Sequence, residues 1–148
     1  MTTNPLHALQ TLGQRVWLDY IQRSLLADGS IGRLIADDGV SGMTSNPAIF
    51  AQAVDVDREY AMAIARLAAA GTRPRDIYEA LTFEDVCRAA DLLRPVYERT
   101  RGRDGYISIE ISPHLADDTE RTVAAAVRTW DCINRANLLI KVPATAAS

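Results

Sequence analysis

The chain has 148 residues, of which 16 are basic and 19 acidic, and its formal net charge is −3. This length and an apolar content of 48% predict one domain with a hydrophobic core. The sequence has no basic stripe, which argues against nucleic acid as a partner. Cys87 and Cys132 are far apart in the sequence and do not have the spacing of metal ligands, which argues against a zinc site. We recognise no signal peptide and no apolar run long enough to span a bilayer, so we expect a cytoplasmic protein and not a membrane protein.

The first part of the chain alternates strand-like and helix-like segments. Val16–Asp19 is an apolar run that ends in an acid and predicts a buried strand, and Val40–Ser45 predicts a second one. A turn at Asp28–Ser30 leads into a short helix between these strands. Asn46 and Pro47 begin the next helix, because proline suits the first helical position and keeps the preceding residue extended.

The middle of the chain is predicted to be helical. Asp55–Ala70 is rich in alanine and predicts one helix, and residues 74–100 predict a second helical region. Within that second region, Thr82–Asp85 resembles a capping box, so we expect a break near Leu81. We also expect Pro95 to kink or interrupt the end of this region.

The last part contains the clearest strand. Tyr106–Ile111 alternates, with isoleucines on one face and Ser108 and Glu110 on the other. Thr119–Arg135 predicts a helix, and Leu138–Val142 predicts a fourth strand. Strands that alternate with helices in this way are typical of a parallel α/β sheet.

Ionisable side chains at the strand ends favour a barrel over a doubly wound sheet. Three of the four strands carry one at a matching position, namely Asp19, Glu110 and Lys141. In a β/α barrel such residues converge at the face where chemistry occurs. A doubly wound sheet is expected to have a glycine-rich turn after its first strand, and residues 19–23 contain no glycine. We therefore predict the first half of a (β/α)8 barrel over residues 1–148, with about four parallel strands and the barrel incomplete.

Lys141 is the only lysine of the chain and lies in the apolar run Asn137–Pro143. A desolvated amine can add to a carbonyl, whereas a guanidinium cannot, so one interpretation is a Schiff-base lysine shielded from solvent. The other is a lysine whose ammonium group extends to solvent from a strand end. Burial would favour the neutral amine and nearby carboxylates the ammonium, and the sequence leaves open which effect dominates.

Four motifs, taken together and in order, resemble the first four strands of transaldolases, in particular those of the longer bacterial type. They are Val16-Trp17-Leu18-Asp19-Tyr20, Thr44-Ser45-Asn46-Pro47, Ile107-Ser108-Ile109-Glu110-Ile111-Ser112-Pro113 and Leu139-Ile140-Lys141-Val142-Pro143-Ala144-Thr145. This resemblance implies a transferase of the pentose phosphate pathway that moves a dihydroxyacetone unit through a covalent imine, without a metal or organic cofactor. The implied partners are fructose 6-phosphate, sedoheptulose 7-phosphate, glyceraldehyde 3-phosphate and erythrose 4-phosphate.

The same resemblance implies a role for each of four residues. Lys141 matches the nucleophile that forms the Schiff base, and Asp19 the acid/base that takes a proton from the substrate hydroxyl during carbon–carbon cleavage. Glu110 matches the carboxylate that acts through a water when the carbinolamine is dehydrated. Asn46 matches the amide that holds a substrate hydroxyl. Structural alternatives stay open, because Asp19 could cap a turn and Asn46 is a natural helix cap.

The length of the chain departs from this pattern, because a β/α barrel typically needs about 250 residues. One explanation is a fragment or truncated product that is impaired or inactive alone. Another is a homodimer whose open sheet edges pair, and a third is a non-catalytic half-barrel that binds a partner. A related Schiff-base aldolase, which releases the three-carbon unit, is a further alternative, and the phosphate-binding residues are expected in the missing half.

Overall fold

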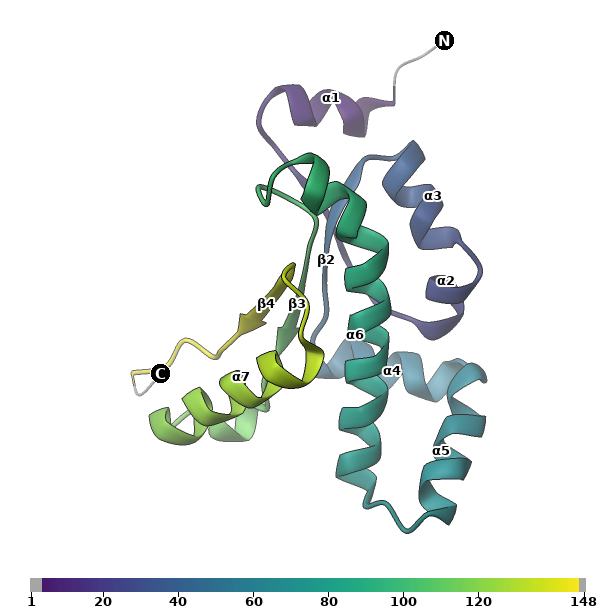
Figure 1. Cartoon of the computed structure of the whole chain (residues 1–148), viewed down its shortest axis with the longest axis vertical. Coiled ribbons are helices and arrows are strands. Elements are labelled where there is room, and N and C mark those ends of the chain that lie inside the picture. The colour runs from purple at the N-terminus through teal and green to yellow at the C-terminus, as the bar shows by residue number, and fades with distance from the viewer. Residues whose placement is uncertain (1–3, 147–148) are drawn as a thin grey trace.

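Four parallel strands form one open sheet in the computed structural model, which describes residues 4–146 (Figure 1). The strands are β1 (Val16–Asp19), β2 (Val40–Thr44), β3 (Tyr106–Glu110) and β4 (Leu138–Lys141). They pair in the spatial order β1-β2-β3-β4. Successive strands are neighbours throughout, as in a β/α barrel, whereas a doubly wound sheet reverses its order at a switch point. The predicted parallel α/β sheet is confirmed, with a strand order consistent with part of such a barrel.

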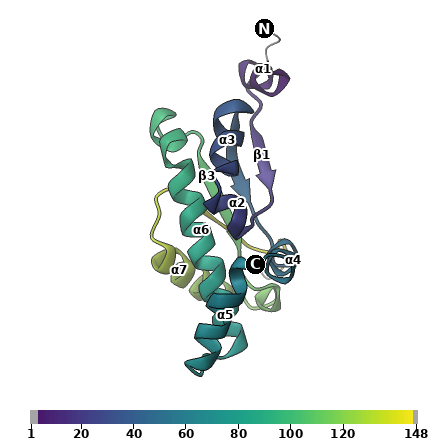
Figure 2. The same ribbon diagram turned by 90° about the vertical axis from the view of Figure 1, so that its right-hand side faces the viewer.

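Helices connect the strands and lie mainly on one side of the sheet (Figures 1 and 2). The first crossover contains α2 (Arg23–Ala27) and α3 (Ser30–Asp37), the second α4 (Pro47–Val56), α5 (Glu59–Ala69) and α6 (Pro74–Arg99), and the third the 3-10 turn η1 (Pro113–Leu115) and α7 (Thr119–Ile133). α1 (Pro5–Thr11) precedes the sheet and is tied by side-chain hydrogen bonds to residues 37–39. Within residues 4–146, no helix combines the length and apolarity needed to cross a bilayer.

The core lies between the sheet and α6. The strands contribute alternate apolar residues, each at most 4% exposed, and these are Met43, Ile107, Ile109 and Leu138. Buried residues of α6 belong to the same cluster, including Leu81, Val86, Ala89 and Leu93. Because side chains alternate along a strand, the residues between those strand positions project from the opposite face.

Helix α6 is continuous, so the predicted break near Leu81 is wrong. The Thr82 hydroxyl donates to the carbonyl of Tyr78 at 2.8 Å within the helix, instead of capping a new one. Asp85, expected at the third helical position of a capping box, is completely buried and serves a tertiary network. Thr82 and Asp85 therefore match the capping-box pattern in sequence, but their side chains bond to other groups and do not start a new helix.

The expected interruption at Pro95 is also not seen, because α6 continues to Arg99. Proline removes the N–H that would bond to the carbonyl four residues earlier, at Asp91. Both Pro95 and Asp91 are exposed, so this carbonyl lies on the side of the helix where water can satisfy it.

The helix predicted over Asp55–Ala70 is interrupted at Asp57, where α4 ends and α5 begins two residues later. The Asp57 carboxylate accepts the N–H groups of Glu59 at 3.0 Å and Ser24 at 2.8 Å. Burial acts to raise the pKa of Asp57, but these backbone hydrogen bonds outweigh it and hold the pKa below its ordinary value. The interruption thus joins α5 to the start of α2.

A buried polar network joins α2, α5 and α6. Arg23 donates to Asp85 at 2.9 Å, and the Tyr60 hydroxyl donates to the same carboxylate at 2.7 Å. Arg23 is 6% exposed, and Tyr60 and Asp85 are fully buried. Burial and the hydrogen bond to Asp85 raise the pKa of Tyr60 far above its ordinary value, so the phenol keeps the proton that it donates. Three helices are thereby fixed at one point in the core.

Two apolar surfaces have no covering element among residues 4–146. The face of the sheet opposite the core exposes Trp17 by 37% and Leu139 by 41%. One side of α7 exposes Val123 and Val127 by 56% each and Trp130 by 44%. The chain therefore has a layer of helices on one face of the sheet and an open second face.

We predict that Asp85→Ala lowers the free energy of unfolding by about 3–5 kcal/mol, because it removes the fully buried carboxylate that pairs with the buried Arg23 guanidinium and leaves the partly exposed Glu84 as its ion-pair partner. Tyr60→Phe, which removes one hydrogen bond to a charged group, should cost about 1.5–3 kcal/mol. Urea unfolding followed by circular dichroism measures both changes. Asp91→Ala is the matched control on the exposed side of α6, since its ion pair with Arg135 is a surface pair. Equal effects of Asp85→Ala and Asp91→Ala would contradict the role given to the network.

Candidate active site

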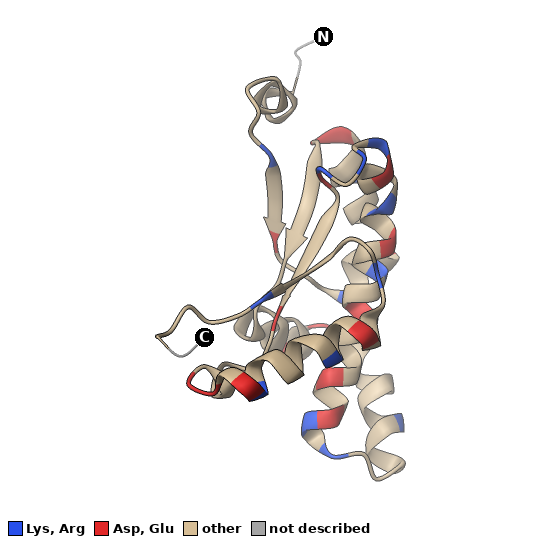
Figure 3. Cartoon of the chain, turned by 60° about the vertical axis from the view of Figure 1, so that its left-hand side comes forward, with Lys and Arg blue, Asp and Glu red and all other residues tan. Residues whose placement is uncertain are grey.

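The open face of the sheet gathers the polar side chains of its strands. In the strand register Asp19 is opposite Thr44, which is opposite Ser108, and one row further along Glu110 is opposite Lys141. Paired residues of a parallel sheet, and residues two apart on one strand, project to the same side. All five side chains therefore share the face opposite the core, near the carboxyl ends of the strands. Figure 3 shows that the acidic and basic positions of the strands lie near their carboxyl ends and that the strands are otherwise uncharged.

The lysine and the glutamate are in contact. Lys141 Nζ lies 3.5 Å from Glu110 Oε2 and donates to Thr44 Oγ1 at 3.2 Å. The Lys141 side chain is 38% exposed, so the expected shielding from solvent is not provided by residues 4–146. The reason is that β4 is an edge strand, with β3 on one side and no described strand on the other.

Two hydroxyl groups on this face were not recognised in the sequence. Ser108 Oγ donates to Thr44 Oγ1 at 2.8 Å, so Thr44 lies between Ser108 and Lys141. The alternation of β3 placed Ser108 on the same face as Glu110. Its partner on β2 depends on the strand register, which the alternation within one strand does not specify.

Gly42 leaves space for the indole ring of Trp17 on the open face, next to the row that contains Thr44. It pairs with Trp17 on β1 and with Tyr106 on β3, one row below Thr44. A Cβ atom at position 42 would collide with the indole of Trp17, so only glycine leaves room for the ring there. The indole therefore lies across β2, below the polar row.

Asp19 lies on the same face of the sheet but takes no part in the ion pair between Lys141 and Glu110. It ends β1, which is separated from β4 by the two strands β2 and β3, and its side chain is exposed. Within residues 4–146 it forms no ion pair, and the residue beside it in the register is Thr44. A substrate lying across the carboxyl ends of the strands would pass between Asp19 and Lys141.

Asn46 serves as a helix cap. Its Oδ1 accepts the N–H of Ile49 at 3.0 Å at the start of α4. Its backbone is extended, as expected for a residue before proline. The cap uses the amide oxygen and leaves the amide nitrogen available for a second partner, so the structural and functional interpretations of this residue are compatible.

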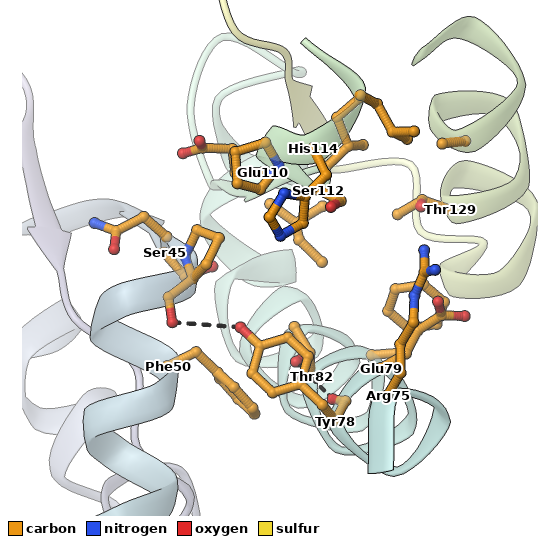
Figure 4. A pocket seen from close by; sticks show the side chains of 18 of the residues that line it. Ser45, Phe50, Arg75, Tyr78, Glu79, Thr82, Glu110, Ser112, His114 and Thr129 are labelled. Carbon is orange, nitrogen blue, oxygen red and sulfur yellow. Dashed lines mark hydrogen bonds between the residues drawn. The ribbon is translucent and has the colours of Figure 1, made fainter. Parts of the chain in front are cut away.

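A cavity of about 710 Å³ adjoins the open face on the helix side of β3 (Figure 4). Phe50 and Tyr78 form one wall, with ring centroids 5.2 Å apart at an angle of 90°, and Ser112 and His114 lie across from them. Burial raises the pKa of Tyr78. Asn46 and Glu110 line the cavity, whereas Asp19 and Lys141 do not. Glu110 therefore lies at the boundary between the cavity and the face that holds the amine.

These groups suit the addition of an amine to a carbonyl. Such a reaction needs a nucleophilic nitrogen, a carboxylate that accepts and returns protons, and donors for the carbonyl oxygen. Lys141, Glu110 and Thr44 bring the three kinds of group together on one face. In the part of the chain that the structure describes, no three His, Cys, Asp or Glu side chains are grouped as metal ligands would be.

Comparison with known proteins gives a consistent result. A protein-family model described as "Transaldolase/Fructose-6-phosphate aldolase" matches residues 16–148. A transaldolase of Thiobacillus denitrificans is 49% identical over 134 residues, which are 90% of this chain and 37% of that protein. Transaldolases of Trichodesmium erythraeum and Thermobifida fusca are 43% and 46% identical, over 98% and 96% of this chain. The chain spans 37 to 39% of the length of these relatives.

We predict that Asn46→Ala lowers the free energy of unfolding by about 1 kcal/mol, because the N–H of Ile49 loses its acceptor. Asn46→Asp should stay within about 0.5 kcal/mol of the original chain, since a carboxylate oxygen caps a helix equally well. Urea unfolding measures both variants. A loss in Asn46→Asp as large as that in Asn46→Ala would rule out capping by the side-chain oxygen.

Proposed function

Because the chain belongs to the transaldolase/fructose-6-phosphate aldolase family, we propose that it carries the imine-forming part of a transaldolase. The reaction would move a dihydroxyacetone unit from a ketose phosphate to an aldose phosphate. We assign residues 1–148 to the first four strands of the barrel domain, since the relatives are more than twice as long. The observation that carries the proposal is the 3.5 Å contact between Lys141 Nζ and Glu110 on the open face.

In the proposed first step, the neutral amine of Lys141 adds to the ketose carbonyl. Glu110 then acts, through a water, in the loss of the carbinolamine oxygen that leaves the iminium ion. A carboxylate 3.5 Å from the nitrogen is close enough to exchange protons with the adduct directly or by one water. The iminium is the electron sink that makes the next bond cleavage accessible.

In the second step, Asp19 would remove the proton of the substrate hydroxyl at the bond to be cleaved. Its place on the same face, with two strands between it and the strand of Lys141, suits a group that acts on a more distant carbon than the carbonyl. Asn46 would hold a hydroxyl through its amide nitrogen while its oxygen caps α4. The aldose phosphate leaves, and the three-carbon unit stays on Lys141 until an acceptor aldehyde arrives.

The family description also includes an aldolase, so release of free dihydroxyacetone instead of its transfer is the second candidate. Adding erythrose 4-phosphate separates the two, because only a transferase makes a new ketose phosphate from it. Within residues 4–146, β1 and β4 each have one edge without a partner strand, which suggests pairing with a second copy, as a homodimer. A non-catalytic binding module is the remaining alternative.

We predict that fructose 6-phosphate and borohydride leave a stable adduct on Lys141, identified by mass spectrometry of peptides. Lys141→Arg is the matched control, because it keeps the charge but cannot form an imine. Any product on the α-amino group should be the same in both proteins. The absence of an adduct at Lys141 in a folded sample would overturn the proposed function and favour the binding module.

We predict that Asp19→Asn changes which adduct is trapped. The original chain should carry three-carbon adducts after cleavage, whereas the variant should keep the uncleaved six-carbon phosphate, with cleavage about 10²–10⁴-fold slower. Intact-mass measurement at increasing times follows both species. If the three-carbon adduct accumulates equally fast in the variant, Asp19 is not the base.

A further inference from the structure

The hydroxyl of Thr44 has one proton for which residues 4–146 provide no acceptor. Thr44 Oγ1 accepts one hydrogen bond from Ser108 Oγ at 2.8 Å and a second from Lys141 Nζ at 3.2 Å. A hydroxyl group has two acceptor positions and one donor. Both acceptor positions are occupied, so the donor remains for a group outside the described chain.

The direction of the bond between the two hydroxyls follows from burial. Ser108 is 4% exposed, and Thr44 is the more exposed of the pair. If Thr44 donated to Ser108, the buried Ser108 proton would have no acceptor, and an unsatisfied buried donor costs about 1–3 kcal/mol. Donation from Ser108 to Thr44 avoids that cost and directs the free proton of Thr44 to the open face.

This proton is close to the nitrogen that would attack a carbonyl. When Lys141 Nζ bonds to a carbonyl carbon, the oxygen on that carbon lies next to the nitrogen. Thr44 Oγ1 is 3.2 Å from the nitrogen, and Glu110 approaches it from another strand at 3.5 Å. The hydroxyl and the carboxylate therefore reach the same carbon centre from β2 and β3.

We propose that Thr44, oriented by Ser108, donates a hydrogen bond to the carbonyl oxygen as Lys141 adds to the carbon, an inference that rests on the proposed function. A donor that is already oriented stabilises the negative charge that develops on this oxygen. Thr44 is then a catalytic residue for imine formation, and Ser108 is the residue that positions it.

The addition step is balanced in atoms and electrons. The lone pair of the neutral amine forms the C–N bond, and the π pair of the carbonyl moves onto oxygen. The proton lost by the nitrogen passes to the Glu110 carboxylate and from there to the oxygen, which gives a neutral carbinolamine. Thr44 keeps its own proton throughout.

The test measures adduct formation on Lys141 with dihydroxyacetone and cyanoborohydride over a range of ketone concentrations. This ketone carries no phosphate, so it does not depend on phosphate-binding groups outside the chain. Thr44→Val should lower the saturating rate by about 10²-fold, with little change in the half-saturating concentration. Thr44→Ser should restore most of the rate, and Ser108→Ala should fall between these variants. Ser41→Ala is the matched control, because Ser41 is on β2 but faces away from the site.

A second reagent distinguishes two roles for Thr44. It can donate a hydrogen bond to the carbonyl oxygen, or it can only hold the Lys141 amine in place. Trinitrobenzenesulfonate attaches an aryl group to an amine by displacing sulfite, and the carbon that is attacked carries no carbonyl oxygen. Arylation of Lys141 should proceed at similar rates in the original chain and in Thr44→Val. An equal loss in both reactions, an unchanged rate of adduct formation, or a failure of Thr44→Ser to rescue would each overturn the inference.

The outcome for Thr44 is distinguishable from that for the proposed function. If dihydroxyacetone forms an adduct that Thr44→Val slows, but fructose 6-phosphate forms none, the role of Thr44 holds and the sugar phosphate function fails. If the folded chain forms neither adduct, both fail.

Discussion

The parallel register of β3 and β4 is the constraint on which the candidate site depends. It places Glu110 directly opposite Lys141 and, through β2, places Thr44 within reach of the same nitrogen. Because side chains alternate along a strand, a slip of one residue would turn Lys141 towards the helices and expose Ile140 instead. The burial of Leu138 and Ile140 on β4, beside the isoleucines of β3, opposes that slip, because all of these side chains pack in or against the core. The packing of apolar side chains on the core face thus fixes the positions of Glu110 and Lys141 on the open face.

Much of this arrangement could be predicted from local patterns. The four strands, their parallel order and the shared face of Asp19, Glu110 and Lys141 follow from alternation and from polar groups at strand ends. The continuity of α6 could not be predicted, because Thr82 and Asp85 match a capping box yet bond elsewhere. The network of Arg23, Tyr60 and Asp85 could not be predicted either, because its members are 25 to 62 residues apart in the chain and local patterns do not show such contacts.

The site was predictable in its charges but not in its hydroxyls. A lone lysine and two strand-end acids are conspicuous in a sequence, whereas serine and threonine occur on most surfaces. Thr44 acquires its meaning from two partners, one on β3 and one on β4. The degree of solvent access to Lys141 also lay beyond local patterns, because it depends on what lies beside the edge strand.

The single lysine also limits how the chain can be modified. Acylation, glycation or attachment of an isopeptide-linked tag has one side-chain amine to act on, and that amine is Nζ of Lys141. Acylation or an isopeptide bond at this nitrogen would remove the positive charge that faces Glu110 and delocalise the lone pair needed for addition. Lysine acylation on this part of the polypeptide would therefore act as an on–off event at the reacting nitrogen, with no peripheral lysine at which a milder adjustment could occur.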